Sequence, residues 1–234
     1  MSKEDAEWIG TRIYRNECSS DADKLLWWNA GEEFASLGIA HFIWYPEGKT
    51  GPYRETFPHL IAYLKRQEVA IPAILEPFGA NPWPTRSAFL KEKNSSYSRE
   101  LRTFLKNTIP QQTAFLVESF ENALSLLLSS YPEEMRGQIQ EKITAIACSK
   151  EGRYALLDYA NFKGDGTLET ERYQGKGWGL KQVLEEMPAH SDNSVAAFVE
   201  TAKKVLERRV ANAPSEREEQ RWLPGWISRL NTYL

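Results

Sequence analysis

The second half of the sequence is dominated by segments whose apolar residues recur at the spacing of an α-helix. This pattern predicts helices over 98–107, 111–128, 132–148, 153–162, 177–187, 194–212 and 214–233, after two earlier ones over 5–18 and 57–66. Ser194 is a candidate N-cap and Pro214 a candidate first residue for the last two helices. A chain with so many helical segments must form a mainly α fold.

The segment 34–45, FASLGIAHFIWY, interrupts this pattern because it is rich in aromatic and branched residues. Gly31 and Pro46 bound it, which predicts one small β-hairpin. Prolines punctuate 47–84, and the chain contains neither an internal repeat nor a linker-like tract. The expected fold is a helical bundle with one small β-hairpin, a mainly α form of α+β, in a single domain over 1–234.

Composition narrows the class of protein. Of the 234 residues 41% are hydrophobic, eight are tryptophan and 26% are charged, as in a soluble globular protein. A net charge of −3 gives no basic field for nucleic acid, and no run approaches the roughly 20 apolar residues of a membrane span. The polar, acidic N-terminus is unlike a secretory signal, so we expect a cytoplasmic protein, or a periplasmic or exported one whose signal was trimmed.

Cys18 and Cys148 are the only cysteines, too few for a disulfide scaffold and wrongly spaced for a zinc site. Two partly buried thiols are the favoured interpretation, and one bridge is the alternative. We expect neither a metal nor a cofactor. The sequence leaves the oligomeric state open.

Glu17 is the most informative single residue for function. It follows Ile13 by four residues and Ile9 by eight, which places it near the apolar stripe of the first helix. Partial burial there favours the protonated carboxyl that a general acid requires. The alternative is a glutamate that leans out into water at the helix end.

After Glu17 comes the predicted hairpin with Ser36-Leu37-Gly38-Ile39-Ala40-His41. This order resembles the phage-type lysozymes, in which a catalytic Glu closes the first helix and the hairpin reads Thr-(Ile/Val)-Gly-(Ile/Tyr)-Gly-His. Ser36 replaces the threonine and Ala40 a glycine. The stretch ALLDYANFKG (155–164) and a tail with Arg209, Pro214, Arg217, Trp222, Trp226 and Tyr233 carry weaker likenesses to the same family.

The resemblance implies a glycoside hydrolase that acts on cell-wall peptidoglycan or a related amino-sugar polymer. Glu17 would protonate the leaving oxygen, while an ionised carboxylate and the Ser36 hydroxyl would handle water. An apolar pocket of Ile13, Phe34, Ile39 and Trp44 would keep Glu17 neutral. His41 would support the site, although a lone histidine after a strand is more often structural.

The second carboxylate departs from the family, because Asn29 and Ala30 stand where an aspartate is expected. We assign this role to Glu32, at the turn after Gly31, with Glu33 and Asp23 as alternatives.

A glycine-rich stretch, KGDGTLETERYQGKGW (163–178), is the second candidate for a binding surface. Its amides, charges and rings suit sugars and peptide stems. The candidate substrate-binding residues beside His41 are Asn161, Lys163, Tyr173, Gln174 and Trp178. The alternative is a well-packed surface loop.

Two other functions compete with hydrolysis. A cysteine hydrolase that uses Cys18 and His41 is disfavoured, because Cys18 lies at the C-terminal end of a predicted helix, where the helix dipole destabilises a thiolate. The stronger rival is a catalytically inactive lysozyme-like module that binds a glycan or another protein. Trp27 and Trp28 fit packing better than sugar stacking.

Overall fold

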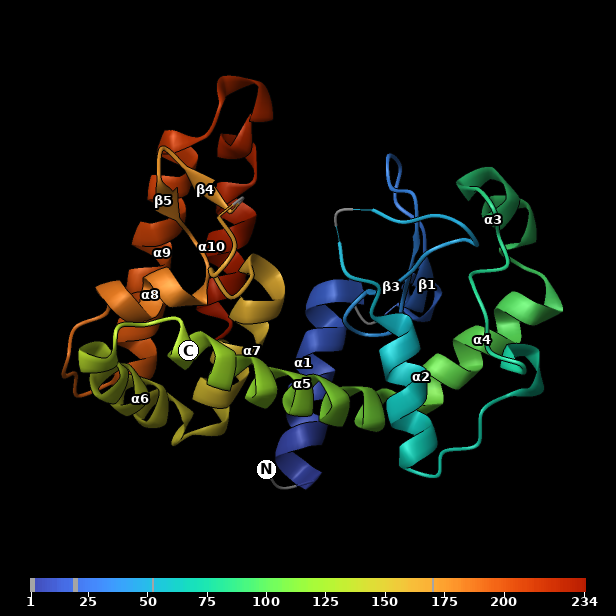
Figure 1. Ribbon diagram of the computed structural model, residues 1–234, viewed down its shortest axis with the longest axis horizontal. Coiled ribbons are helices and arrows are strands. Elements are labelled where there is room, and N and C mark those ends of the chain that lie inside the picture. The colour runs from blue at the N-terminus through green and yellow to red at the C-terminus, as the bar shows by residue number, and fades with distance from the viewer. Residues whose placement is uncertain (1–2, 19–20, 52, 170) are drawn as a thin grey trace. The chain divides into compact units, whose positions relative to one another are not determined.

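The computed structural model describes residues 3–18, 21–51, 53–169 and 171–234, without the side chains of Lys3 and Cys18. Contacts between Cα atoms divide the chain into two compact units, Met1–Leu116 and Val117–Leu234 (Figure 1). The single domain over 1–234 stays a prediction.

Helices make up most of both units, which confirms the predicted mainly α class. The first unit contains α1 (Lys3–Cys18), α2 (Phe57–Arg66), α3 (Arg86–Glu92), α4 (Ser96–Asn107), the start of α5 (Ile109–Ser129), and the 3-10 turns η1 (Ala22–Leu25) and η2 (Ala73–Leu75). The second contains the rest of α5, α6 (Glu133–Ala147), α7 (Lys150–Lys163), α8 (Leu180–Glu186), α9 (Ser194–Asn212), α10 (Leu223–Asn231), and the 3-10 turns η3 (Ser215–Arg217) and η4 (Glu219–Arg221). No helix in the described part of the chain is long and apolar enough to cross a membrane.

The predicted hairpin forms in the first unit from β2 (Ala35–Leu37) and β3 (Phe42–Trp44). A third strand, β1 (Leu26–Trp27), pairs with β2 and was not predicted. The turn Gly38–His41 joins β2 to β3, with positive φ angles of 69° at Gly38 and 51° at His41. A non-glycine residue seldom adopts this backbone conformation, so His41 holds a special position in the turn.

The glycine-rich stretch contains a second hairpin, β4 (Arg172–Tyr173) and β5 (Lys176–Gly177). Its two-residue turn, Gln174–Gly175, has positive φ at both positions, as the favoured short hairpin turns require. The stretch is therefore folded by regular strand pairing, which the sequence pattern did not indicate.

Aromatic rings from the proline-punctuated segment build the core of the first unit. The Trp44 ring contacts the rings of Phe57, Phe78 and Trp83, with centroids 4.9, 5.7 and 6.5 Å apart. In the same unit, α1 buries Ile9 and Ile13. Gly10 faces Thr113 of α5 so closely that an added Cβ would lie 2.1 Å from Thr113 Oγ1.

In the second unit α9 packs against both α8 and α10, and α6 packs against α7 (Figure 1). The hydrophobic side chains between these helices, including Tyr159, Val183, Phe198 and Leu206, are fully buried. The Tyr159 and Phe198 rings meet edge to face with centroids 5.6 Å apart.

Three predictions from the sequence are wrong. The segment 214–233 is not one helix: Glu218 has a φ of 48° and separates η3 from η4, and α10 begins only at Leu223. Asn193, not Ser194, caps α9, because its side chain accepts a hydrogen bond from the Ala196 amide. Cys148 is a free, exposed thiol rather than a partly buried one, while the Cys18 side chain lies outside the described residues.

Candidate functional site

Glu17 lies in the last turn of α1, where the helix meets the turn between β2 and β3. Its Oε2 atom is 3.6 Å from Nδ1 of His41, and the Glu17 side chain is 16% exposed. Ile9 and Ile13 on the same helix are buried, so the stripe that predicted a partly buried Glu17 is present. The structure thus brings two of the predicted site residues together as a carboxyl–imidazole pair.

Gln112 of α5 fixes the turn that carries His41. Its Oε1 accepts a hydrogen bond of 3.0 Å from the Ile39 amide, and its Nε2 donates to the carbonyl of Leu105 and to Thr108 Oγ1. Gly38 leaves room for this amide, since an added Cβ would lie 2.3 Å from Gln112 Oε1. The sequence analysis missed Gln112, because a single glutamine in an apolar helix does not reveal its distant partners.

Ser36 lies in the central strand of the sheet and is 3% exposed. It pairs with Trp27 on β1 and with Ile43 on β3, and both of these residues are half-buried. The four residues of the predicted apolar pocket, Ile13, Phe34, Ile39 and Trp44, are all buried in this unit. The Ser36 hydroxyl therefore belongs to the less buried face of an otherwise apolar sheet.

Glu32 lies between β1 and β2, at the position chosen for the second carboxylate. Its Oε2 accepts a hydrogen bond of 3.1 Å from Asn29 Nδ2, and its backbone carbonyl accepts one of 2.7 Å from the Trp28 indole. Trp28 is buried, whereas the half-buried Trp27 ring lies 4.8 Å below the Lys93 ammonium. The carboxylate of Glu32 is thus held by the loop on which it stands.

The remaining predicted binding residues belong to the second unit, and their environments differ. Asn161 and Gln174 are exposed, and Tyr173 is half-buried. Trp178 is buried; its ring centroid is 4.6 Å from that of Tyr173, and its carbonyl accepts a hydrogen bond from the Tyr159 hydroxyl. The substrate-binding role of these residues stays a prediction.

An arginine of α9 occupies the space beside these rings. The Arg209 guanidinium lies 4.0 Å from the Trp178 ring centroid and donates two hydrogen bonds, of 2.7 and 2.8 Å, to Glu219. Glu219 also accepts a hydrogen bond from the Tyr173 hydroxyl. Burial alone would raise the pKa of Glu219, but the hydrogen bonds from Arg209 and Tyr173 outweigh it and lower that pKa. Tyr173 and Trp178, two residues of the predicted binding surface, therefore already contact other side chains of the protein.

Lys163, the last residue of α7, is 7% exposed. Its Nζ lies 3.2 Å from the ring centroid of Trp226 and 4.0 Å from that of Phe162. Burial, followed by the nearby Arg209, lowers the pKa of Lys163 from 10.5 to about 6. The two rings attract a cation and oppose this effect in part, since a desolvated cation–π contact contributes about 2 kcal/mol, equivalent to roughly 1.5 in the pKa. The amine is therefore less basic than that of an ordinary lysine.

A buried ion pair fixes α10 against α7 close to this lysine. The Arg229 guanidinium donates two hydrogen bonds of 2.8 Å to the fully buried Asp158, and the Tyr233 hydroxyl donates a third of 2.6 Å. Burial, and then the charge of Asp158, raise the pKa of Tyr233. These contacts join α10 and the residues after it to α7 within the second unit.

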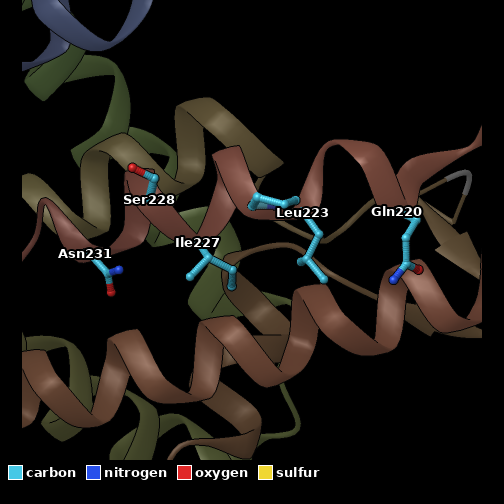
Figure 2. Close-up of a pocket in the computed structure, with 6 residues that line it drawn as sticks. Gln220, Leu223, Ile227, Ser228 and Asn231 are labelled. Carbon is cyan, nitrogen blue, oxygen red and sulfur yellow. The ribbon is translucent and has the colours of Figure 1, made fainter.

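Two surface grooves lie elsewhere. One, of about 500 Å³, follows α10 and is lined by Gln220, Leu223, Pro224, Ile227, Ser228 and Asn231 (Figure 2). The other, of about 300 Å³, lies in the first unit and is lined by 45–49, Glu55, Pro58 and 78–80. Neither set of described lining residues includes a predicted site residue. Within the same described part, no group of three or more His, Cys, Asp or Glu side chains is arranged to hold a metal ion.

Comparisons of the chain with protein-family models, with curated proteins and with solved structures give no match.

Proposed function

We propose that the protein is a glycoside hydrolase that acts on cell-wall peptidoglycan or a related amino-sugar polymer. One observation carries the proposal: the partly buried Glu17 carboxyl, at the end of the first helix, lies 3.6 Å from His41 on the hairpin turn. The phage-type lysozymes, which the sequence resembles, combine the same elements in the same order.

Glu17 is the proposed general acid. A proton on its carboxyl would pass to the glycosidic oxygen as the bond to the leaving sugar breaks. His41 acts as a positioning residue, because its imidazole meets the carboxyl from a turn that Gln112 holds in place. This anchoring keeps the carboxyl in one orientation, which proton transfer requires.

The far side of the sugar is assigned to Glu32 and Ser36. Both belong to the β1–β2–β3 region, so one small sheet would supply a carboxylate and a hydroxyl for the attacking water. In the second unit, the exposed Asn161 and Gln174 offer amides for substrate hydroxyl and acetamido groups.

A catalytically inactive module that binds glycan or protein is the second candidate. The Glu32 carboxylate already accepts a hydrogen bond from Asn29, and the Arg209 guanidinium covers the Trp178 ring. A carboxylate and an aromatic ring with such contacts have a structural role. A lysozyme-like fold can also be retained after its catalytic activity is lost.

The test is the loss of turbidity of purified cell wall with the Glu17→Gln variant. General acid catalysis typically contributes 10² to 10⁴-fold, so cleavage should fall to near background while the thermal midpoint stays level or rises, since glutamine keeps the shape but cannot donate the proton. Glu7→Gln, at an exposed position of the same helix, is the matched control and should cleave like the parent.

Glu32→Gln should also slow turnover, and damage by Glu33→Gln or Asp23→Asn instead would relocate the second carboxylate. Full activity of Glu17→Gln would remove the general-acid assignment. A parent protein that sediments with cell wall but cleaves nothing would replace the hydrolase with the binding module.

A further inference from the structure

Lys163 has a different environment from the ordinary lysines of this protein. Its amine lies over the rings of Phe162 and Trp226 rather than beside a carboxylate. In the described part of the chain, its nitrogen has neither a hydrogen bond nor an ion pair. By contrast, Lys65 is paired with Glu76 and Lys203 with Glu200.

The charged groups around Lys163 neutralise one another. Arg209 is bound by Glu219 through two hydrogen bonds, and Arg229 is bound by Asp158 in the same way. Each carboxylate is therefore committed to an arginine, and a proton on Lys163 would add an uncompensated charge to a buried cluster. The pKa of Lys163 falls accordingly, to about 6.

From this geometry we propose that Lys163 is a nucleophilic amine that forms an imine with an uncharged aldehyde or ketone carrying a flat or apolar group. A desolvated lysine beside other cationic groups is the usual form of an imine-forming amine in proteins. The paired charges favour an uncharged ligand, and the two rings offer flat apolar walls to it. This activity is independent of glycoside hydrolysis and uses none of the residues assigned to it in the first unit.

The proposed step needs no other reactant. The lone pair of the amine attacks the carbonyl carbon, and a C–N bond forms while the C=O double bond opens. The carbonyl oxygen takes both amine protons and leaves as water, and a C=N bond remains. Hydrolysis of the imine reverses the step and returns the amine and the carbonyl compound.

Trace labelling of the full chain with formaldehyde and cyanoborohydride tests the amine. At pH 7 the unprotonated fraction is roughly 0.9 for a pKa of 6 and roughly 0.0003 for a pKa near 10.5, so Lys163 should react at least about ten times faster than Lys203, even after burial slows it. Peptide mass spectrometry measures both rates from pH 5 to 9, and Lys163→Arg identifies the labelled peptide.

The rate at Lys163 should be level above pH 7 and fall below pH 6. A rate no higher than that of Lys203 at pH 7, or one that drops about tenfold per pH unit from 9 to 7 as for an ordinary lysine, would overturn the proposal.

Benzaldehyde and glyoxylate, each with cyanoborohydride, test the class of ligand. The uncharged aromatic aldehyde should give several-fold more Lys163 adduct than the anionic one, and Trp226→Leu should reduce this preference. Equal yields, or a higher yield with glyoxylate, would overturn the assignment of an uncharged, flat ligand.

Discussion

Glu17 and Lys163 stand at equivalent positions, in the last turn of α1 and of α7, yet their surroundings are opposite. The Glu17 carboxyl meets an imidazole on a neighbouring turn, whereas the Lys163 amine meets two aromatic rings. Burial without a carboxylate partner, together with the nearby Arg209, penalises the charged form of Lys163 and lowers its pKa. The difference shows two ways to hold a functional group, one through pairing and one at a cost in stability.

The ion pair beside Lys163 provides the largest expected effect. Asp158→Ala should destabilise the protein by about 3–5 kcal/mol, because it leaves the Arg229 charge buried without its carboxylate. Urea unfolding measures this loss. Tyr233→Phe, which removes only one hydrogen bond to Asp158, should cost about 1 kcal/mol. If Asp158→Ala costs less than Tyr233→Phe, the ion pair does not hold α10 to α7.

The support of the hairpin turn beside Glu17 should give an intermediate effect. Gln112→Ala leaves the buried Ile39 amide without its acceptor, at a cost of about 1–3 kcal/mol. Turnover of cell wall should fall as well, since the turn that positions His41 loses its anchor. Gln140→Ala, at an exposed position of α6, is the control and should change stability by less than about 0.5 kcal/mol. Normal turnover in Gln112→Ala would show that the hydrogen bond from Ile39 to Gln112 is not needed for catalysis.

The titration of Lys163 should appear as a slope in the free energy of unfolding against pH, rather than as the loss of a single contact. With a pKa of about 6 in the folded protein and 10.5 as its ordinary value, the unfolded chain binds the extra proton between these two pH values. The free energy of unfolding should therefore rise with pH in this window, by up to about 1.4 kcal/mol per pH unit from this residue. Lys163→Met should remove that slope, and Lys203→Met should keep it. Parallel curves for the parent and Lys163→Met would contradict the shifted pKa.

The sequence predicted those helices and strands that depend on the residues within and next to them. The helix over Phe57–Arg66 and the hairpin strands of 35–37 and 42–44 follow from apolar periodicity and flanking turn residues. The short strand β1 did not, because two residues become a strand only by pairing with β2. Glu218 broke a predicted helix by adopting a left-handed conformation that ordinary propensities do not indicate for glutamate.

In the candidate site too, the sequence predicted what depends on neighbouring residues and missed what depends on distant ones. The stripe of α1 predicted a partly buried Glu17, since Ile9, Ile13 and Glu17 lie on one helix. Nothing local indicated that Gln112 would hold the hairpin turn, more than 70 residues away in the sequence. Nor did anything local indicate that Glu219 would accept a hydrogen bond from Tyr173, or that Arg209 would lie over the Trp178 ring, in the predicted binding surface.

The close contact between Gly10 and Thr113 restricts how this sequence can change over time. A methyl group at position 10 would overlap the Thr113 hydroxyl, so α1 and α5 touch almost at the level of their backbones. Replacing Gly10 by alanine should be damaging alone but tolerated once position 113 has lost its branched side chain. The two positions are therefore expected to be epistatic, and substitution at 113 must come first. Glu17 lies two helical turns beyond Gly10 on α1, so a substitution that pushed α1 away from α5 would also displace the proposed acid. Substitution at 113 first avoids this displacement.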